Sequence, residues 1–319
     1  MTIASTTTEA ALATRAANRR GILAMLAAMC GFICNDTLIK LAGETMPLGE
    51  IILTRGIMAL ILMAALTTMM GAWRKFPAGT ARPLGLRVIG ELGATLFYLT
   101  ALLSMPLANA TAILQGMPLV MTVLAAFYLK EQVGWRRWVA VLIGFVGMLL
   151  VVQPGLSGFD TSAPIAVAAL GFVALRDLSN RFIPAAAPTI LVAMTTMTAV
   201  TIAGAVMVAI DGYGGLPTSR ELAILACAAV FLTLAFYFIT DAMRSGELSV
   251  VAPFRYSIIV WAIILGFLVW GDVPGPLRTF GIFLIVGSGL FIFYRERMRQ
   301  RKLDAAMRSG LPQTSDASR

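Results

Sequence analysis

The chain has 319 residues, of which 59% are hydrophobic and only 13% charged, and its mean hydropathy is +0.85. Ordinary soluble domains carry about 25% charged residues. This composition therefore excludes a soluble enzyme, a disordered regulator and a secreted disulfide scaffold. It predicts an integral membrane protein, because the apolar residues suffice for about nine or ten spans of ~20 residues each.

Ten apolar runs are long enough to cross a bilayer, and each is bounded by Gly, Pro or charge. Lipid offers no hydrogen bonds to the backbone and the runs lack strand-like alternation, so an all-α protein is expected. We number them spans 1 to 10, at residues 21–42, 48–70, 86–103, 107–129, 135–153, 164–183, 189–210, 221–243, 248–270 and 277–294. Residues 1–20 and 295–319 are then terminal tails, the second of them basic and partly disordered.

The net charge of +9 reflects membrane topology and not a nucleic-acid partner. Of the 25 Lys and Arg residues, 20 lie in the tails, in the connections on one side or at the span ends next to them, two lie on the other side, and Lys40, Arg55 and Arg255 lie deeper inside spans. The positive-inside rule places the Lys- and Arg-rich side in the cytoplasm. We therefore expect both termini to be cytoplasmic, in a multi-pass protein of the bacterial cytoplasmic (inner) membrane.

The two halves of the chain align on each other without a gap at a shift of 141 residues. Charges, prolines and turn glycines match along the whole chain, including Asp36 with Asp177, Pro47 with Pro188 and Gly134 with Gly275. Each repeat holds five spans, at residues 21–153 and 164–294, and five is odd. The second repeat must therefore enter the membrane from the opposite side, as in secondary transporters with inverted repeats.

Two segments resemble the EamA-type permeases of the drug/metabolite transporter superfamily. One is ALLSMPLANATAILQGMPLVMTVLAAFYLKEQVGWRRWVAVLIGFVGMLLVV at residues 101–152, with its Ala-rich entry and mid-span Pro118. The other is DTLIKLAGETMPLGEIILTRG, which holds Asp36, Lys40, Pro47 and Arg55 and is similar to members that take up vitamins or S-adenosylmethionine-like molecules. The resemblance covers residues 21–294 and implies a ten-span, two-half transporter, with Arg55 as a structural residue.

Charged residues inside spans are costly and are functional candidates. Asp36 and Lys40 share one helix face of span 1, and the shift maps them onto Asp177 and Arg181 of span 6. A symmetric structural ion pair explains both sites. The functional alternative is that they form an outer and an inner gate.

A polar stripe marks span 3, where Glu91, Thr95 and Tyr98 lie on one helix face. The equivalent positions of span 8 are apolar, which favours a role in substrate binding; the alternative is that Glu91 reaches the inner surface beside Arg87. Because the chain has no histidine, proton coupling would need carboxylates, and the candidates are Glu91, Asp36, Asp177 and Asp241.

Spans 4 and 9 are the inverted partners expected to frame the site. Thr111, Gln115 and Pro118 lie on one face of span 4, and Asn109 lies near its inner end. Pro118 cannot donate a hydrogen bond to the carbonyl of residue 114, so a bend is expected there. Pro253 is expected to bend span 9 in the same way.

Arg255 in span 9 is the sharpest single signal. It lies about seven residues into the span, hence ~10 Å from its start, and a guanidinium at this depth needs an anionic partner. We expect Arg255 to bind an anionic substrate group, with Gln115, Asn109 and Thr111 as hydrogen-bonding residues. Tyr98, Tyr256 and Trp261 would form the wall. The alternative is a permanent structural pair of Arg255 with Glu91 or Asp241.

Small residues in spans 5 and 10, including Gly144, Gly147 and Gly281, allow close helix contact. Packing within one chain is the first interpretation, and a homodimer interface is the alternative. The basic tail from Arg295 to Lys302 is expected to lie on the lipid bilayer. Cys30, Cys34 and Cys227 are expected to pack as small apolar residues, with no metal site and no cofactor.

These patterns favour a secondary transporter that moves a small polar or zwitterionic organic metabolite by alternating access. An amino-acid-like, vitamin-like or nucleoside-like molecule fits. The alternatives are an intramembrane enzyme, for which the chain holds no recognisable catalytic motif, and a non-transporting scaffold or lipid-handling protein. No nucleotide-binding P-loop motif is present, so ATP is not the direct energy source in this chain.

Overall fold

The computed structural model describes residues 2–69, 71, 73–128, 134–153, 162–180, 182–184, 186–212, 214–245 and 248–308. All regular secondary structure in this part of the chain is helical, and ten of its segments are long and apolar enough to cross a membrane. The predicted all-α membrane fold with ten spans is therefore confirmed.

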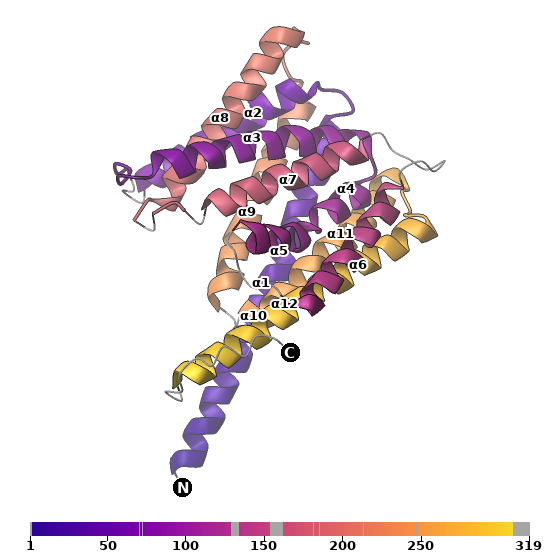
Figure 1. Cartoon of the computed structure of the whole chain (residues 1–319). Helices are drawn as coiled ribbons and strands as arrows, with labels where there is room; N and C mark the ends of the chain where they lie inside the picture. Colours follow the sequence, from indigo (N-terminus) through magenta and orange to yellow (C-terminus); the bar gives the residue numbers. More distant parts are fainter. Residues whose placement is uncertain are drawn as a thin grey trace.

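The helices follow one another along the chain as shown in Figure 1. Their bounds are α1 (Thr2–Ala42), α2 (Leu48–Met69), α3 (Ala81–Ser104), α4 (Leu107–Leu114), α5 (Met117–Phe127), α6 (Trp135–Val152), α7 (Ala163–Asn180), α8 (Thr189–Asp211), α9 (Ser219–Ser245), α10 (Leu248–Val251), the 3₁₀ helix η1 (Ala252–Tyr256), α11 (Ser257–Trp270) and α12 (Pro276–Arg308). Two helices extend beyond their spans: α1 begins in the N-terminal tail, and α12 continues through the basic segment to Arg308.

Spans 4 and 9 are both interrupted at the same point of the repeat. Span 4 consists of α4 and α5, with the break at Gln115 and Gly116. Pro118 lies at the start of α5, where a missing backbone N–H is tolerated. Span 9 changes from η1 to α11 at Tyr256 and Ser257, the residues that the 141-residue shift aligns with the break in span 4.

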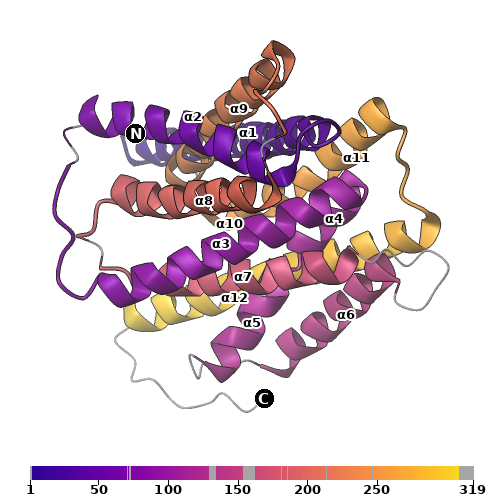
Figure 2. The same ribbon diagram turned by 90° about the horizontal axis from the view of Figure 1, so that it is seen from above.

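Helix packing follows the pattern that an exchange of the two halves predicts. Helix α1 packs along α9, and α3 packs along α7; each of these pairs becomes the other when the halves are exchanged. The pairs α2 with α8 and α6 with α12 map onto themselves. Figure 2 shows α3 beside α7 and α2 beside α8 in the view from above.

Glycines set the closest helix contacts. Gly147 of α6 and Gly281 of α12 face each other, because a Cβ atom on Gly147 would lie 2.7 Å from the Gly281 carbonyl oxygen. A Cβ atom on Gly90 of α3 would lie 2.6 Å from the backbone nitrogen of Arg176 on α7. The small residues of spans 5 and 10 thus serve packing within the chain, which was the first interpretation.

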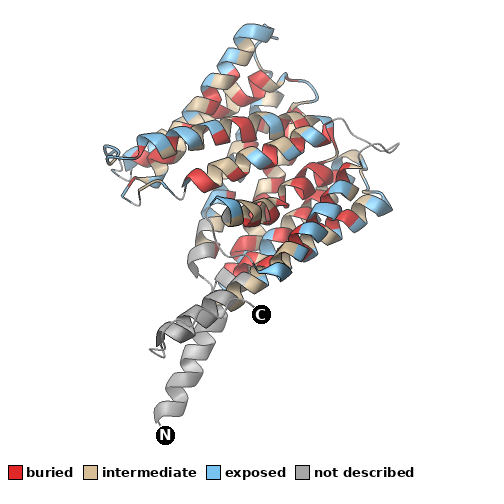
Figure 3. Cartoon of the chain, viewed as in Figure 1, coloured by how far each residue is buried: buried red, intermediate tan, exposed pale blue. Residues whose placement is uncertain are grey.

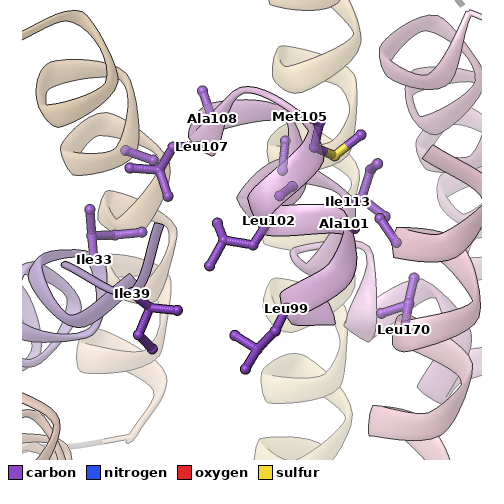
Figure 4. Close-up of a cluster of buried hydrophobic side chains, with 14 of the residues drawn as sticks. Ile33, Ile39, Leu99, Ala101, Leu102, Met105, Leu107, Ala108, Ile113 and Leu170 are labelled. Carbon is purple, nitrogen blue, oxygen red and sulfur yellow. The ribbon is translucent and has the colours of Figure 1, made fainter. Parts of the chain in front are cut away.

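The apolar core lies between the halves and is centred on the start of α4. Among the described residues, the buried ones gather where helices face each other, and exposed ones cover much of the outside, as the colours of Figure 3 show. In Figure 4, Leu107 and Ala108 of α4 lie near the end of α3, with Ile33 and Ile39 of α1 on one side and Leu170 of α7 on the other. This core holds the two halves together around the interrupted span 4.

Candidate functional site

Asp36 of α1 is held by two hydrogen bonds from uncharged groups. The Tyr98 hydroxyl on α3 donates to Asp36 Oδ2 at 2.6 Å, and Asn35 Nδ2 donates to Oδ1 at 2.9 Å. Arg55 of α2 acts electrostatically on Asp36, and the Thr111 hydroxyl of α4 neighbours that of Tyr98. Four helices of the first half therefore meet at this carboxylate.

Glu91 of α3 joins the first half to α7 through arginine. Its carboxylate lies 3.5 Å from Arg176 Nη1 and 4.0 Å from Arg87 Nη2. Arg176 also donates from Nε to Asp177 Oδ1 at 2.8 Å. Arg176 thus lies between two carboxylates from different halves, and the side chains of this cluster are only partly buried.

Arg255 differs from the other arginines near these clusters because it is the exposed one that also has no partner among the described residues. It forms no hydrogen bond or ion pair with any residue in the described part of the chain. The charges that act on it are those of Asp177 and, with opposite sign, Arg176. A solute that bound this guanidinium would therefore displace no partner among the described residues.

The alternative prediction for Arg255 was a permanent ion pair with Glu91 or Asp241. In the structure, both carboxylates have other partners. Glu91 pairs with Arg87 and Arg176. Asp241 of α9 accepts from Arg20 of α1 at 2.7 Å and 3.1 Å, near the end of the bundle that carries the N-terminus. The structure thus gives Asp241 a role in joining α1 to α9.

Several buried polar atoms on the interrupted spans have no hydrogen-bond partner among the described residues. They are the Asn109 Oδ1 atom and the Thr111 hydroxyl on α4, the Tyr256 hydroxyl on η1, and the Ser257 hydroxyl and Trp261 Nε1 on α11. Buried polar atoms are paired in more than about 90% of cases. Spans 4 and 9 thus carry polar atoms that have hydrogen-bonding capacity left for a solute.

Three further candidate residues, Tyr256, Gln115 and Thr111, are buried in contacts between helices. Tyr256 is buried against α12, with Gly289 beside its hydroxyl and Phe293 at 6.5 Å between ring centroids. Gln115 and Thr111 are buried around the break in span 4.

Lys40 closes the end of α3. Its ammonium group donates to the carbonyls of Leu102, at 2.9 Å, and of Met105, and it lies 5.4 Å from the centroid of the Trp270 ring. Arg181, its predicted counterpart in span 6, lies outside the described residues.

A metal centre finds no support in the described part of the chain, where no group of three or more His, Cys, Asp or Glu side chains could hold an ion. Cys30 and Cys34 are partly buried free thiols on α1, and Cys227 is an exposed free thiol on α9.

Sequence reasoning overlooked Arg176 and Asn35 as site residues. Arg176 is one of the 20 basic residues that set the predicted topology, and in the structure it bridges Glu91 and Asp177. The repeat carries a usable signal, because the 141-residue shift aligns Asn35 with Arg176 directly before the matched Asp36 and Asp177. In each half, therefore, a nitrogen-bearing side chain precedes the aspartate and donates to it.

Curated relatives of this chain are membrane transporters from bacteria. An S-adenosylmethionine uptake transporter of Rickettsia bellii is 28% identical over 198 residues, covering 62% of this chain and 67% of that protein. A riboflavin transporter of Rhizobium johnstonii is 27% identical over 216 residues, covering 67% and 70%. A pseudopaline exporter of Pseudomonas aeruginosa is 27% identical over 276 residues, covering 84% and 94%. The chain spans about two thirds of the length of the S-adenosylmethionine transporters that it matches.

The fold and the family agree with these relatives. A crystal structure of another protein superposes on this chain with a TM-score of 0.59 at 19% sequence identity, covering 88% of this chain and 97% of the other, so the fold is shared. The EamA-like transporter family matches residues 19–153 and again residues 162–294. The chain therefore belongs to the EamA-like transporter family.

Proposed function

We propose that this protein is a secondary active transporter of a small zwitterionic metabolite, with Arg255 as the residue that binds its anionic group. The observation that carries the proposal is Arg255, an exposed residue inside a membrane span whose guanidinium has no partner in the described part of the chain. An intramembrane charge without a partner is costly, and such residues mark substrate or ion pathways. A guanidinium fork matches a carboxylate or phosphate in two parallel hydrogen bonds.

The neighbouring carboxylates favour a substrate that also carries a positive charge. Asp177 acts electrostatically on Arg255, and Glu91 and Asp177 share Arg176. A cationic group on the substrate can interact with these carboxylates while the anionic group binds Arg255. S-adenosylmethionine, which relatives of this chain take up, combines a carboxylate, an ammonium and a sulfonium group with a flat ring. Trp261 is an aromatic residue on α11 that a flat ring can stack on.

Alternating access provides the transport cycle for this site. The two halves would move relative to each other about the interrupted spans 4 and 9. The cluster of Glu91, Arg176 and Asp177 joins α3 to α7 and would open and close as a gate. Asp36, Glu91 and Asp177 are the carboxylates available to carry a coupling proton. The substrate would cross unmodified, so the protein would be a transporter without enzymatic activity.

The charge distribution supports a bacterial inner-membrane location with both termini in the cytoplasm. In this orientation, the end of the bundle that carries Arg20, Asp241 and the C-terminal end of α12 faces the cytoplasm.

The test compares metabolites inside cells and in their medium by mass spectrometry. Wild type, Arg255→Ala and the matched control Arg82→Ala are expressed at equal membrane levels; Arg82 is an exposed arginine in the first turn of α3. We expect one zwitterionic metabolite to redistribute with wild type and with Arg82→Ala, and the redistribution to fall at least tenfold with Arg255→Ala. Metabolite conversion inside the cell without redistribution would overturn the transport proposal, and full activity of Arg255→Ala would overturn the role of Arg255.

A further inference from the structure

A groove of about 620 Å³ runs along the outer surface between α6 and α12. Its walls are apolar and exposed, with Ile143 of α6 at 45% and Phe283 of α12 at 68% exposure. Gly287 belongs to its lining, and a Cβ atom there would have no neighbour within 4 Å. The same two helices touch at Gly147 and Gly281. The groove therefore opens where the pair diverges from this contact.

One end of the groove combines two arginines with two aromatic residues. Trp135 and Arg136 begin α6, while Tyr294 and Arg295 lie where span 10 ends, and all four line the groove. Trp135 and Tyr294 are 66% and 59% exposed, as is typical of aromatic residues at a membrane surface. Neither Arg136 nor Arg295 forms a hydrogen bond or ion pair within the described part of the chain, and no acidic residue lines the groove.

The length of the groove matches a lipid chain. From Arg295 back to Phe283 the lining covers twelve helical steps, or ~18 Å. One leaflet of the hydrocarbon core is about 15 Å thick. A molecule with its charge at the arginines would thus extend its apolar part to the middle of the bilayer.

We propose that this groove binds one anionic phospholipid of the inner leaflet, with its phosphate at Arg136 and Arg295 and an acyl chain over Gly287. Paired arginines suit a phosphate, and basic pockets between spans on the cytoplasmic side bind acidic lipid headgroups. A second copy of the chain fits less well. In a twofold interface the same patch meets itself, which would bring four arginines together without an acidic partner in the groove.

Two variants test the proposed headgroup site and the proposed acyl-chain site separately. Arg136→Ala combined with Arg295→Ala removes both cations, and Gly287→Leu places a side chain in the groove from a position where a Cβ atom has no neighbour within 4 Å. Each full-length protein is purified in detergent, stripped of lipid and titrated with dioleoylphosphatidylglycerol or dioleoylphosphatidylcholine. Native mass spectrometry counts bound lipids and subunits, and thermal unfolding gives Tm.

Matched controls carry the same substitutions elsewhere on the surface. Arg74→Ala combined with Arg82→Ala removes two exposed arginines, and Gly171→Leu fills open space on α7. We expect wild type and both controls to retain one phosphatidylglycerol and to gain Tm from it over phosphatidylcholine. The double arginine variant should lose affinity roughly 30-fold, as expected for two arginines at a lipid headgroup, and Gly287→Leu should lose the bound lipid.

Two results would overturn the proposal. If phosphatidylglycerol binds all five proteins equally, the lipid recognises overall charge and not this groove. If the lipid-free wild type is a dimer that Gly287→Leu converts to a monomer, the groove is an interface between copies of the chain. Either result leaves the transport proposal standing, because that is tested at Arg255.

Discussion

Asp36 and Asp177 occupy equivalent positions of the two halves, yet their surroundings differ. Asp36 accepts hydrogen bonds from Tyr98 and Asn35, which are uncharged. Asp177 accepts from Arg176, whose second partner is Glu91. The repeat thus retains an aspartate and a donor directly before it in both halves, but only the second half uses a charged donor.

The comparison indicates that backbone and site follow different constraints. Both halves keep the same order of helix contacts and the same interrupted span, because each half must fill the membrane in the same way. The substrate is not symmetric and meets both halves at once. A binding site between the halves therefore needs different side chains at equivalent positions, and Arg255, aligned with Leu114, is a further example.

The largest expected effect comes from removing the charged donor. Arg176→Ala leaves Glu91 and Asp177 without the cation between them. We expect a loss of about 2 kcal/mol of interaction free energy in this cluster. This is the lower end of the range for removing one member of a charge pair, because these side chains are partly exposed. Asn35→Ala, at the equivalent position, removes one hydrogen bond to the Asp36 carboxylate, and a bond to a charged group is worth about 1.5 kcal/mol. Transport in proteoliposomes should therefore fall about 30-fold with Arg176→Ala and about tenfold with Asn35→Ala. Equal losses would show that the two aspartates are functionally equivalent.

A smaller effect on transport is expected from removing the Tyr98 hydroxyl, which has no counterpart in the second half. Tyr98→Phe removes the hydrogen bond to Asp36, and bonds to charged groups are worth about 1.5 kcal/mol or more. We expect the apparent KM for transport to rise about tenfold, with unchanged protein levels in the membrane. Tyr237→Phe is the control, since Tyr237 is 63% exposed on α9, and it should transport like wild type. A Tyr98→Phe variant with wild-type kinetics would exclude a role for this bond in transport.

The smallest effect concerns the two equivalent helix crossings. A Cβ atom on Gly90 would lie 2.6 Å from the backbone of Arg176, whereas on Gly31 it would lie 3.1 Å from the Ala235 side chain. Gly90→Ala should therefore destabilise the protein by about 1 kcal/mol or more through overpacking, and Gly31→Ala by less. Thermal unfolding in detergent measures the difference. The reverse order would mean that the crossing of α1 and α9 is the tighter one.

The spans and the two-repeat arrangement could be predicted from the sequence because the lipid bilayer imposes strict conditions on the backbone. Every backbone group in the bilayer must be satisfied within its own helix, so ten apolar runs became ten helical spans. The break in span 4 lies just before Pro118, as the missing N–H requires. The repeat also aligned Gly71 with Gly212, and both have positive φ, at 57° and 85°, close to the C-terminal ends of α2 and α8.

Only the tertiary structure decided which polar groups meet. Asp36 and Lys40 share a helix face, but Asp36 bonds to Tyr98 across the gap to α3, and Lys40 caps the carbonyls at the end of that helix. The partners of Glu91 and the exposure of Arg255 likewise depend on how α3, α7 and η1 approach one another. Hydropathy and proline determine the bounds and bends of a single helix, so these features can be predicted from the local sequence. Side-chain contacts between helices depend on the rotation and spacing of the packed helices, which the chain sets only when it is folded.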